Sequence, residues 1–246
     1  MTTRTRIAAG NWKMNGTAAD LAEVEAIAAT GARTSEVVTL LCLPATLIDR
    51  ARGYGVSLGG QTLHAATSGA HTGDISGQML VDAGATYVIV GHSERRTDHG
   101  ESDADICAQA EAAWAAGLTA VICIGETEAQ YRAGETLDVL RGQIEGSVPQ
   151  GATPGNTVIA YEPVWAIGTG LTPEVPEIQS VHAEVRAALG AHVHGGETLS
   201  VLYGGSVKAA NAVGIFALDD VDGGLVGGAS LKAADFVPVI EALAAG

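Results

Sequence analysis

Short apolar runs alternate along this chain with longer segments in which apolar residues recur at the spacing of an amphipathic helix. Runs that are apolar throughout, rather than at every second position, are typical of parallel strands covered by helices. We therefore predict strands at residues 6–10, 37–43, 56–60, 87–90, 119–124, 157–161, 199–203 and 223–226. The predicted helices cover residues 18–29, 47–52, 77–83, 103–116, 128–145, 174–189, 209–216 and 233–244.

Each strand with its following helix takes up about thirty residues, which is the usual size of a βαβ unit. Eight such units within 246 residues predict an α/β fold, a (β/α)8 barrel that forms a single domain over residues 1–246. A doubly wound sheet is the alternative. No G-x-G-x-x-G motif opens a helix after the first strand, which weakens a dinucleotide-binding interpretation. In a barrel, function is expected on the loops that follow the strands.

The formal net charge of -15 argues against nucleic acids and anionic membranes as partners, because both are bound by basic surfaces. An anionic substrate would need a local site, and the lysines available are Lys13, Lys208 and Lys232. No apolar run approaches the roughly 20 residues needed to cross a bilayer, and the N-terminal residues do not resemble a signal peptide. The cysteines lack Cys-x-x-Cys spacing, so we expect a reduced, cytoplasmic protein.

Glu162 is the first polar side chain after the apolar run 157–161, and Pro163 and a loop of small residues with one tryptophan follow it. A carboxylate at the end of a strand, beside a loop that could exclude water, is a candidate general base. The alternative is a solvated glutamate, and this segment alone supports both interpretations equally.

Two further loops carry candidate groups. His92 follows Gly91 after the strand 87–90, where a helical turn begins. The dipole of a helix N-terminus lowers the pKa of an imidazole, and a neutral imidazole can polarise a carbonyl. Lys13 follows the first strand and could hold a phosphate or an oxyanion, although surface lysines are more common. Asn11 could orient Lys13 or contact a substrate oxygen.

Glycine-bearing turns follow the last two predicted strands: Gly204, Gly205 and Ser206 in one, Gly227 and Gly228 in the other. Glycine lets the backbone approach a ligand closely, and the loops after strands 7 and 8 of such barrels often bind phosphate. Either turn alone is explained by geometry. Together they favour a phosphate site whose donors are Ser206 and the glycine amides.

A base, a neutral polarising group, a cation and a phosphate cradle together indicate proton abstraction next to the carbonyl of a sugar phosphate. This reaction needs no metal, nucleotide or covalent cofactor. The pair His192 and His194 has no third ligand nearby in sequence, so we expect no metal site there. The alternatives are an isomerase of another sugar phosphate and a non-catalytic phosphate-binding barrel, which would be expected to lack a catalytic group.

Five motifs closely resemble those of the triosephosphate isomerase family, in order and at matching spacing over nearly the whole chain. They are residues 9–15 (AGNWKMN), 91–96 (GHSERR), 160–170 (AYEPVWAIGTG), 203–207 (YGGSV) and 226–230 (VGGAS).

The resemblance implies that Glu162 moves a proton between C1 and C2 of dihydroxyacetone phosphate and glyceraldehyde 3-phosphate. His92 would act as the neutral electrophile. Asn11 and Lys13 would bind substrate, with Lys13 stabilising negative charge and Glu94 as a secondary charged residue beside it.

The resemblance also implies a phosphate site and a lid. Gly168, Ser206, Gly227 and Gly228 would supply amides to the phosphate. The loop over residues 163–173 would close over the substrate as a lid. Trp165 and Ile167 would exclude water from the site, and Tyr203 and Ser206 would hold the lid closed. Leu171 stands where the family commonly has lysine, which would alter the opening rate of the lid.

Members of the family are homodimers. In this chain the long loop over residues 61–74 would be the interlocking arm, because long loops without secondary structure are uncommon unless they are functional. Thr72 would reach the partner's Asn11 and the partner's His92. Asp74 is one methylene shorter than the family's usual glutamate, which would weaken an ion pair at the interface.

Overall fold

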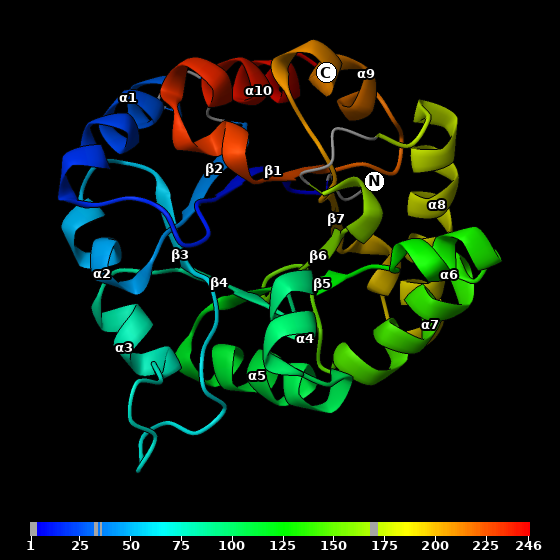
Figure 1. Ribbon diagram of the computed structural model, residues 1–246, viewed down its shortest axis with the longest axis horizontal. Helices are drawn as coiled ribbons and strands as arrows, with labels where there is room; N and C mark the ends of the chain where they lie inside the picture. Colours follow the sequence, from blue (N-terminus) through cyan, green and yellow to red (C-terminus); the bar gives the residue numbers. More distant parts are fainter. Residues whose placement is uncertain (1–3, 32–33, 35, 168–171) are drawn as a thin grey trace.

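The computed structural model describes residues 4–31, 34, 36–167 and 172–246. Its strands form a closed barrel in which each strand pairs in parallel with the next and the last pairs with the first, as Figure 1 shows. The predicted fold class is therefore confirmed. The strands are β1 (Arg6–Asn11), β2 (Val37–Cys42), β3 (Ser57–Gly60), β4 (Tyr87–Val90), β5 (Thr119–Ile124), β6 (Thr157–Tyr161), β7 (Ser200–Tyr203) and β8 (Gly223–Val226).

Helices surround the barrel and cover the outer face of its strands (Figure 1). Within the described ranges the α-helices are α1 (Leu21–Gly31), α2 (Ala45–Ile48), α3 (Gly77–Asp82), α4 (Ser93–His99), α5 (Asp103–Ala116), α6 (Glu128–Ala133), α7 (Thr136–Ser147), α8 (Val175–His192), α9 (Ala209–Phe216) and α10 (Ala233–Ala245). Shorter 3-10 turns are η1 (Ala18–Asp20), η2 (Asp49–Ala51), η3 (Val164–Ala166), η4 (Gly196–Thr198) and η5 (Gly228–Leu231). None of these helices is long and apolar enough to span a membrane.

The helical pattern predicted over residues 128–145 is two helices rather than one. Gly134 adopts a left-handed conformation (φ 74°) and ends α6, and its N–H donates to Gln130 O and Tyr131 O. This is a common way for a helix to end, because glycine has no Cβ to oppose positive φ. The turn expected after His92 extends to the full helix α4.

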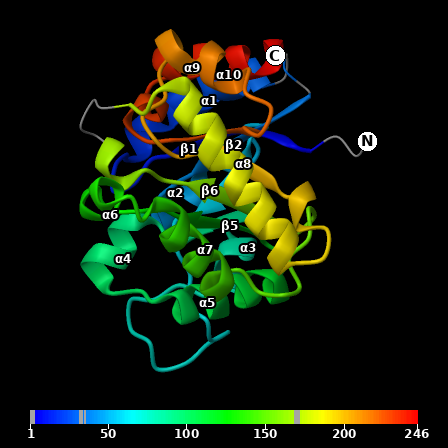
Figure 2. The ribbon, with the colours of Figure 1, turned by 90° about the vertical axis from the view of Figure 1, so that its right-hand side faces the viewer.

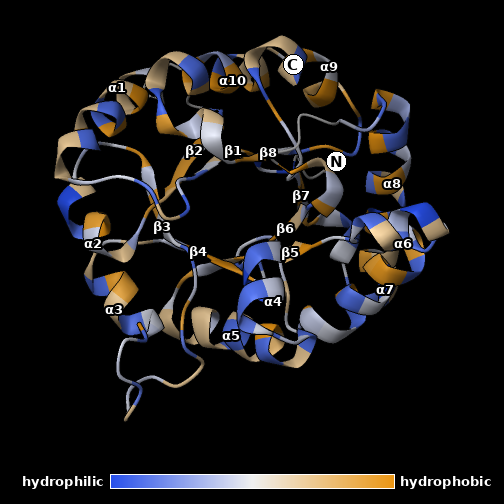
Figure 3. Cartoon of the chain, viewed as in Figure 1, coloured by the Kyte–Doolittle hydropathy of each residue, from blue (hydrophilic) through white to orange (hydrophobic). Residues whose placement is uncertain are grey.

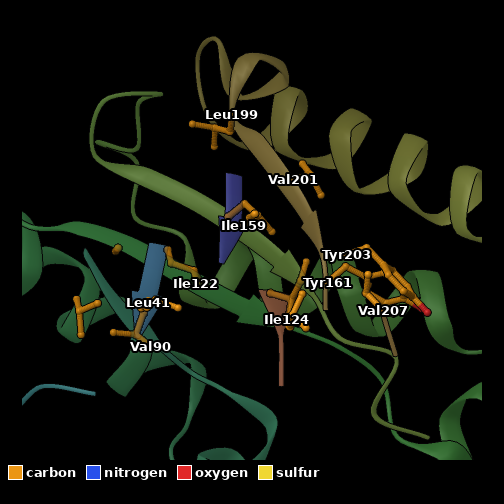
Figure 4. Packing of buried hydrophobic residues seen from close by; sticks show 14 of the residues in the cluster. Leu41, Val90, Ile122, Ile124, Ile159, Tyr161, Leu199, Val201, Tyr203 and Val207 are labelled. Atoms are coloured by element: carbon orange, nitrogen blue, oxygen red, sulfur yellow. The ribbon is translucent and has the colours of Figure 1, made fainter. Parts of the chain in front are cut away.

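The buried side chains form two clusters. The smaller cluster fills the inside of the barrel and takes alternate residues from several strands, such as Ile7 and Ala9 of β1 and Val158 and Ala160 of β6. The larger cluster lies between the strands and the surrounding helices. Figure 3 shows the apolar strands, and Figure 4 shows part of the larger cluster at close range.

The alternation within β6 positions the candidate base. Glu162 comes two residues after Ala160, which faces the barrel interior, so the strand directs its carboxylate to the mouth of the barrel. Strand alternation alone would direct His92 away from the mouth, because Val90, two residues earlier, packs in the outer cluster. Gly91 lies between them with φ 68° and changes the direction of the chain.

Candidate active site

A pocket of about 240 Å³ lies at the carboxyl ends of the strands. It collects residues from the loops after β1, β4, β6, β7 and β8. The predicted residues that line it are Asn11, Lys13, His92, Glu162, Gly205, Ser206, Gly227 and Gly228. Gly168 and Leu171 lie outside the described residues. The chain therefore brings these predicted groups into one cavity.

The Glu162 side chain is buried and hydrogen-bonded at both oxygens. Its Oε1 lies 2.9 Å from His92 Nε2, and its Oε2 accepts the Ser93 N–H at 2.9 Å. Burial alone would raise the pKa of this carboxyl. The neighbouring His92 and the Ser93 N–H stabilise the anion more strongly, so the pKa of Glu162 is lowered from its usual value. The structure thus holds an ionised carboxylate inside the pocket.

His92 is the N-cap of α4, and its Nδ1 accepts the Glu94 N–H at 3.3 Å. This hydrogen bond needs a lone pair on Nδ1, so the proton of the neutral ring lies on Nε2, which faces Glu162. Burial lowers the pKa of His92, but the carboxylates of Glu162 and Glu94 raise it, and the net direction is upward. The lowered pKa expected from the helix dipole is therefore wrong while Glu162 rests on the ring.

Lys13 is held in a left-handed backbone conformation (φ 52°), which is uncommon for a residue with a side chain. Asn11 Oδ1 accepts the Lys13 N–H at 2.9 Å, and Gln61 Nε2 donates to Lys13 O at 2.8 Å. Lys13 Nζ lies 2.6 Å from Glu94 Oε1. Asn11 thus orients Lys13 through the backbone, and the ammonium group is held by Glu94 at the edge of the pocket.

The glycines of the turn after β7 leave room for other groups of the site. A Cβ on Gly204 would lie 2.8 Å from Glu162 Cγ, and one on Gly205 would lie 2.2 Å from the Tyr203 hydroxyl oxygen. Tyr203 is itself buried beneath this turn. Both positions therefore require glycine for close packing, in addition to any role in binding.

The start of the predicted lid rests on a buried glutamate. Trp165 Nε1 donates to Glu126 Oε1 at 2.8 Å, and the Tyr161 hydroxyl donates to the same oxygen at 3.3 Å. The Trp165 ring stacks on Tyr131 with centroids 4.2 Å apart. Ile167 lines the pocket.

The remaining histidines lie away from this pocket. His192 Nε2 is 2.8 Å from Val148 O. On the loop after β3, the ligand atoms of His64, His71 and Asp74 come within 4.8 Å of one another, and they are the one such group found among the described residues. His64 Nδ1 already accepts the Ala66 N–H at 2.9 Å, which leaves its proton on Nε2, the nitrogen that faces Asp74.

A family model described as triosephosphate isomerase matches residues 6–243. A triosephosphate isomerase of Ruegeria sp. (strain TM1040) is 60% identical over 98% of this chain and 98% of its own length. One from Chelativorans sp. (strain BNC1) is 58% identical over 96% of this chain and 95% of its own. The chain belongs to the triosephosphate isomerase family.

The crystal structure of triosephosphate isomerase from Bartonella henselae agrees with this assignment. It superposes with a TM-score of 0.90 at 46% identity, covering 96% of this chain and 98% of that one. As a member of the triosephosphate isomerase family the chain is an aldose–ketose isomerase, and the function predicted from the five motifs is confirmed. The non-catalytic alternative is not favoured.

Several residues of the triosephosphate isomerase site were missed from sequence. Gln61 follows β3 directly and Glu126 comes two residues after the end of β5, and this position at the carboxyl end of a strand was a usable signal. Tyr131 and the amide of Ser93 have no comparable signal, because they matter only through contacts with Trp165 and Glu162.

Proposed function

We propose that this chain interconverts dihydroxyacetone phosphate and D-glyceraldehyde 3-phosphate without a cofactor, as one catalytic domain over residues 1–246, with Glu162 as the base. The observation that carries the proposal is the buried Glu162 carboxylate, which is held at both oxygens and shares one pocket with His92, Lys13 and the glycine turns. A base, a hydrogen-bond donor and a cation that converge on one cavity suit proton transfer beside a carbonyl.

The proton transfer runs in two balanced steps. Glu162 takes the proton from C1 of dihydroxyacetone phosphate, and the electron pair of that C–H bond forms the C1–C2 double bond of an enediolate. The carboxyl then returns the proton to C2 while the hydroxyl proton on O1 passes to O2, which leaves an aldehyde at C1 and a hydroxyl at C2. Because the carboxylate now rests on His92 Nε2 and the Ser93 N–H, it must turn away from them to reach a substrate carbon.

That movement also changes the histidine. The Glu162 carboxylate is a cause of the raised pKa of His92, whereas burial and Lys13 act in the opposite direction. Once the carboxylate leaves, burial and the lysine favour the neutral ring, whose Nε2–H can then donate to the oxygens of the enediolate. The same movement thus releases the base and prepares the electrophile.

Lys13 stabilises the negative charge of the bound substrate. Asn11 keeps Lys13 in place through the hydrogen bond to its backbone N–H. A Cβ on Gly227 would lie 4.0 Å from Lys13 Nζ, so the cation borders the turn after β8. The phosphate is bound by Ser206 and by the amides of Gly205, Gly227 and Gly228, with Gly168 as a further donor. Glu94 and Tyr203 support these groups in secondary roles, Glu94 by holding the Lys13 ammonium group and Tyr203 by packing beneath the turn after β7.

The test is a coupled assay of purified protein with glyceraldehyde 3-phosphate and no added metal or cofactor. Glu162→Asp withdraws the carboxylate by one methylene, and we expect kcat to fall by at least about 100-fold with little change in KM. Glu145→Asp, the same change at an exposed position of α7, is the matched control. Near-native turnover of Glu162→Asp would remove Glu162 as the base. Faster turnover of a longer sugar phosphate would favour the alternative substrate.

We further infer a homodimer built from the loop after β3, residues 61–74, which extends away from the barrel in both Figure 1 and Figure 2. A groove of about 630 Å³ beside the active site is lined by Asn11, Lys13, His92 and Met14 among others. Met14 is 96% exposed. An exposed apolar side chain in a groove and an extended loop on the same chain suit reciprocal insertion, with Thr72 reaching the partner's site.

Sedimentation combined with activity across dilution tests the dimer. Met14→Glu places a charge in the groove, and we expect it to produce monomers of reduced activity. Val213→Glu is the control, because Val213 is 67% exposed on α9, away from the loop (Figure 1). Full activity in a species shown to be monomeric would contradict the requirement for a partner.

A cytoplasmic location, which we also propose, is consistent with the free thiols of Cys42, Cys107 and Cys123.

A further inference from the structure

Gln143 of α7 makes two hydrogen bonds to a single backbone residue, Gly125 in the loop after β5. Its Oε1 accepts the Gly125 N–H at 2.7 Å, and its Nε2 donates to Gly125 O at 3.0 Å. A primary amide presents an acceptor and a donor side by side, whereas an ionised carboxylate or an apolar side chain cannot satisfy both groups. The side chain therefore clamps this residue in both directions.

Gly125 is in direct contact with the backbone of Glu162. A Cβ on Gly125 would lie 1.8 Å from Glu162 O and 3.2 Å from Glu162 Cβ. The neighbouring peptides are joined as well, since the Glu162 N–H donates to Ile124 O at 2.7 Å and the Val164 N–H donates to Glu126 O at 3.2 Å. The backbone on both sides of the base thus rests on the segment that Gln143 holds.

One side of this segment borders a pocket. A cavity of about 320 Å³ lies behind it and is lined by Gln143, Gly125, Glu162 and Arg96 among others. Atoms that line a pocket lack packing contacts on that side. The two amide hydrogen bonds therefore restrain Gly125 in addition to its contact with Glu162.

We propose that Gln143 is a positioning residue, which sets the backbone of Glu162 through Gly125 and thereby the reach of the catalytic carboxylate. This inference rests on the proposed role of Glu162 as the base. A misplacement of about 1 Å at a reacting group can lower a rate by up to 100-fold. Gln143 does not line the substrate pocket, so its loss should act on kcat and leave substrate binding nearly unchanged.

The first test is Gln143→Met, which keeps the length of the side chain and removes both hydrogen bonds. We expect kcat to fall roughly tenfold or more with KM within about twofold of the unchanged chain. The matched control is Gln150→Met, because Gln150 is exposed and lies outside this contact. An unchanged kcat in folded Gln143→Met would overturn the proposal, and so would an equal loss in the control.

The second test is Gln143→Glu, which gives a readout that a merely structural role would not move. An ionised carboxylate still accepts the Gly125 N–H but repels Gly125 O, whereas the protonated acid donates to that oxygen as the amide does. The kcat of this variant, relative to the unchanged chain, should therefore rise as the pH is lowered from 8 toward 5. The same ratio for Gln143→Met should stay flat.

A pH-independent ratio for Gln143→Glu would overturn the proposal, even if Gln143→Met failed to fold. The unchanged chain serves as the reference in both assays. If the unchanged chain isomerises the triose phosphate and the Gln143 variants have the same kcat, the inference about Gln143 fails and the proposed function stands. If Glu162→Asp retained near-native turnover, the role of Glu162 itself would fail first.

Discussion

At the scale of single residues, the space around Glu162 is set by glycines from two neighbouring loops. Gly125 contacts its carbonyl oxygen, and Gly204 lies against its Cγ. The sequence indicated the glycines after β7 as part of a phosphate cradle. The structure adds that Gly204 makes room for the base, a role that depends on which atoms of another strand lie opposite.

Gly204→Ala should therefore impair the base directly. The new Cβ would lie 2.8 Å from Glu162 Cγ and 2.9 Å from Tyr161 O, so the side chain must move. We expect kcat to fall at least about tenfold, with a stability loss of about 1–3 kcal/mol. Gly214→Ala is the control, because nothing lies within 4 Å of a Cβ there. Steady-state kinetics and urea unfolding measure both, and native kcat in Gly204→Ala would refute the contact.

The titration of His92 is a second property of single residues. In the free protein its pKa is raised above 6.5, although burial opposes this, because the carboxylates of Glu162 and Glu94 stabilise the imidazolium. Removing the negative charge in Glu162→Gln leaves burial dominant, so the pKa of His92 should fall below that of the unchanged protein. Glu94→Gln should lower it less. NMR titration of the ring measures the shift, and an unchanged His92 pKa in Glu162→Gln would show that the carboxylate does not control it.

At the scale of elements, apolar periodicity predicted the strands and most helices, because each depends on residues close in sequence. The predicted and observed bounds of β4, β5, β6 and β8 coincide. The helix predicted over residues 47–52 is instead α2 (Ala45–Ile48) followed by the 3-10 turn η2 (Asp49–Ala51). A second exception is residues 128–145, where the periodicity continues across a helix break. The break is made by the backbone of Gly134, whose left-handed conformation has no hydrophobic signature.

Two glycines of this region should respond oppositely to alanine. Gly134 has φ 74°, and nothing lies within 4 Å of a Cβ placed there, so Gly134→Ala should cost about 1–2 kcal/mol from backbone strain alone. Gly142 lies inside α7 with similarly open space, so Gly142→Ala should stabilise by about 0.5–1 kcal/mol. Urea unfolding measures both changes. If both substitutions changed the stability in the same direction, the break between α6 and α7 would be set by packing rather than by the backbone conformation of Gly134.

At the scale of the whole molecule, a buried charge cluster lies where the last strands close the barrel, near their N-terminal ends. β7 and β8 share a single register pair, Tyr203 with Gly224. Beside this seam, the buried Asp222 accepts the Val201 N–H at 2.8 Å, Arg186 Nη2 at 2.8 Å and Arg4 Nε at 2.7 Å. Its carboxylate thus joins β7, α8 and the segment before β1.

Asp222→Ala should destabilise the fold by about 1–3 kcal/mol, because it leaves the Val201 N–H and Arg186 Nη2 without their buried acceptor, while Asp220 still pairs with Arg186 Nε at 2.7 Å. Glu184→Ala is the control: it breaks the exposed pair with Arg141, whose side chains are 49% and 46% exposed, and should cost at most about 1 kcal/mol. Urea unfolding at low and high salt distinguishes them, since only the exposed pair should be sensitive to salt. A loss below 1 kcal/mol for Asp222→Ala would exclude this cluster as a determinant of barrel closure.

The sequence by itself determined the barrel and the loops that carry the site. Strand and helix periodicity is local, and in a parallel barrel every loop after a strand opens on the same face. Glu162, His92, Lys13 and Asn11 could therefore be placed together from their positions in the chain. The five motifs then narrowed the chemistry to one family.

Only the tertiary structure decided how these groups are held. The Ser93 amide reaches Glu162 across 69 positions of the chain, and Gln143 reaches Gly125 from a different element. The upward shift of the His92 pKa arises in the same way, chiefly from the Glu162 carboxylate in the loop after β6. Hydrophobic periodicity records which face of an element is buried, but it does not record which atoms of distant elements meet there. Hydrogen bonds and pKa shifts depend on those atoms, so they follow from the folded chain alone.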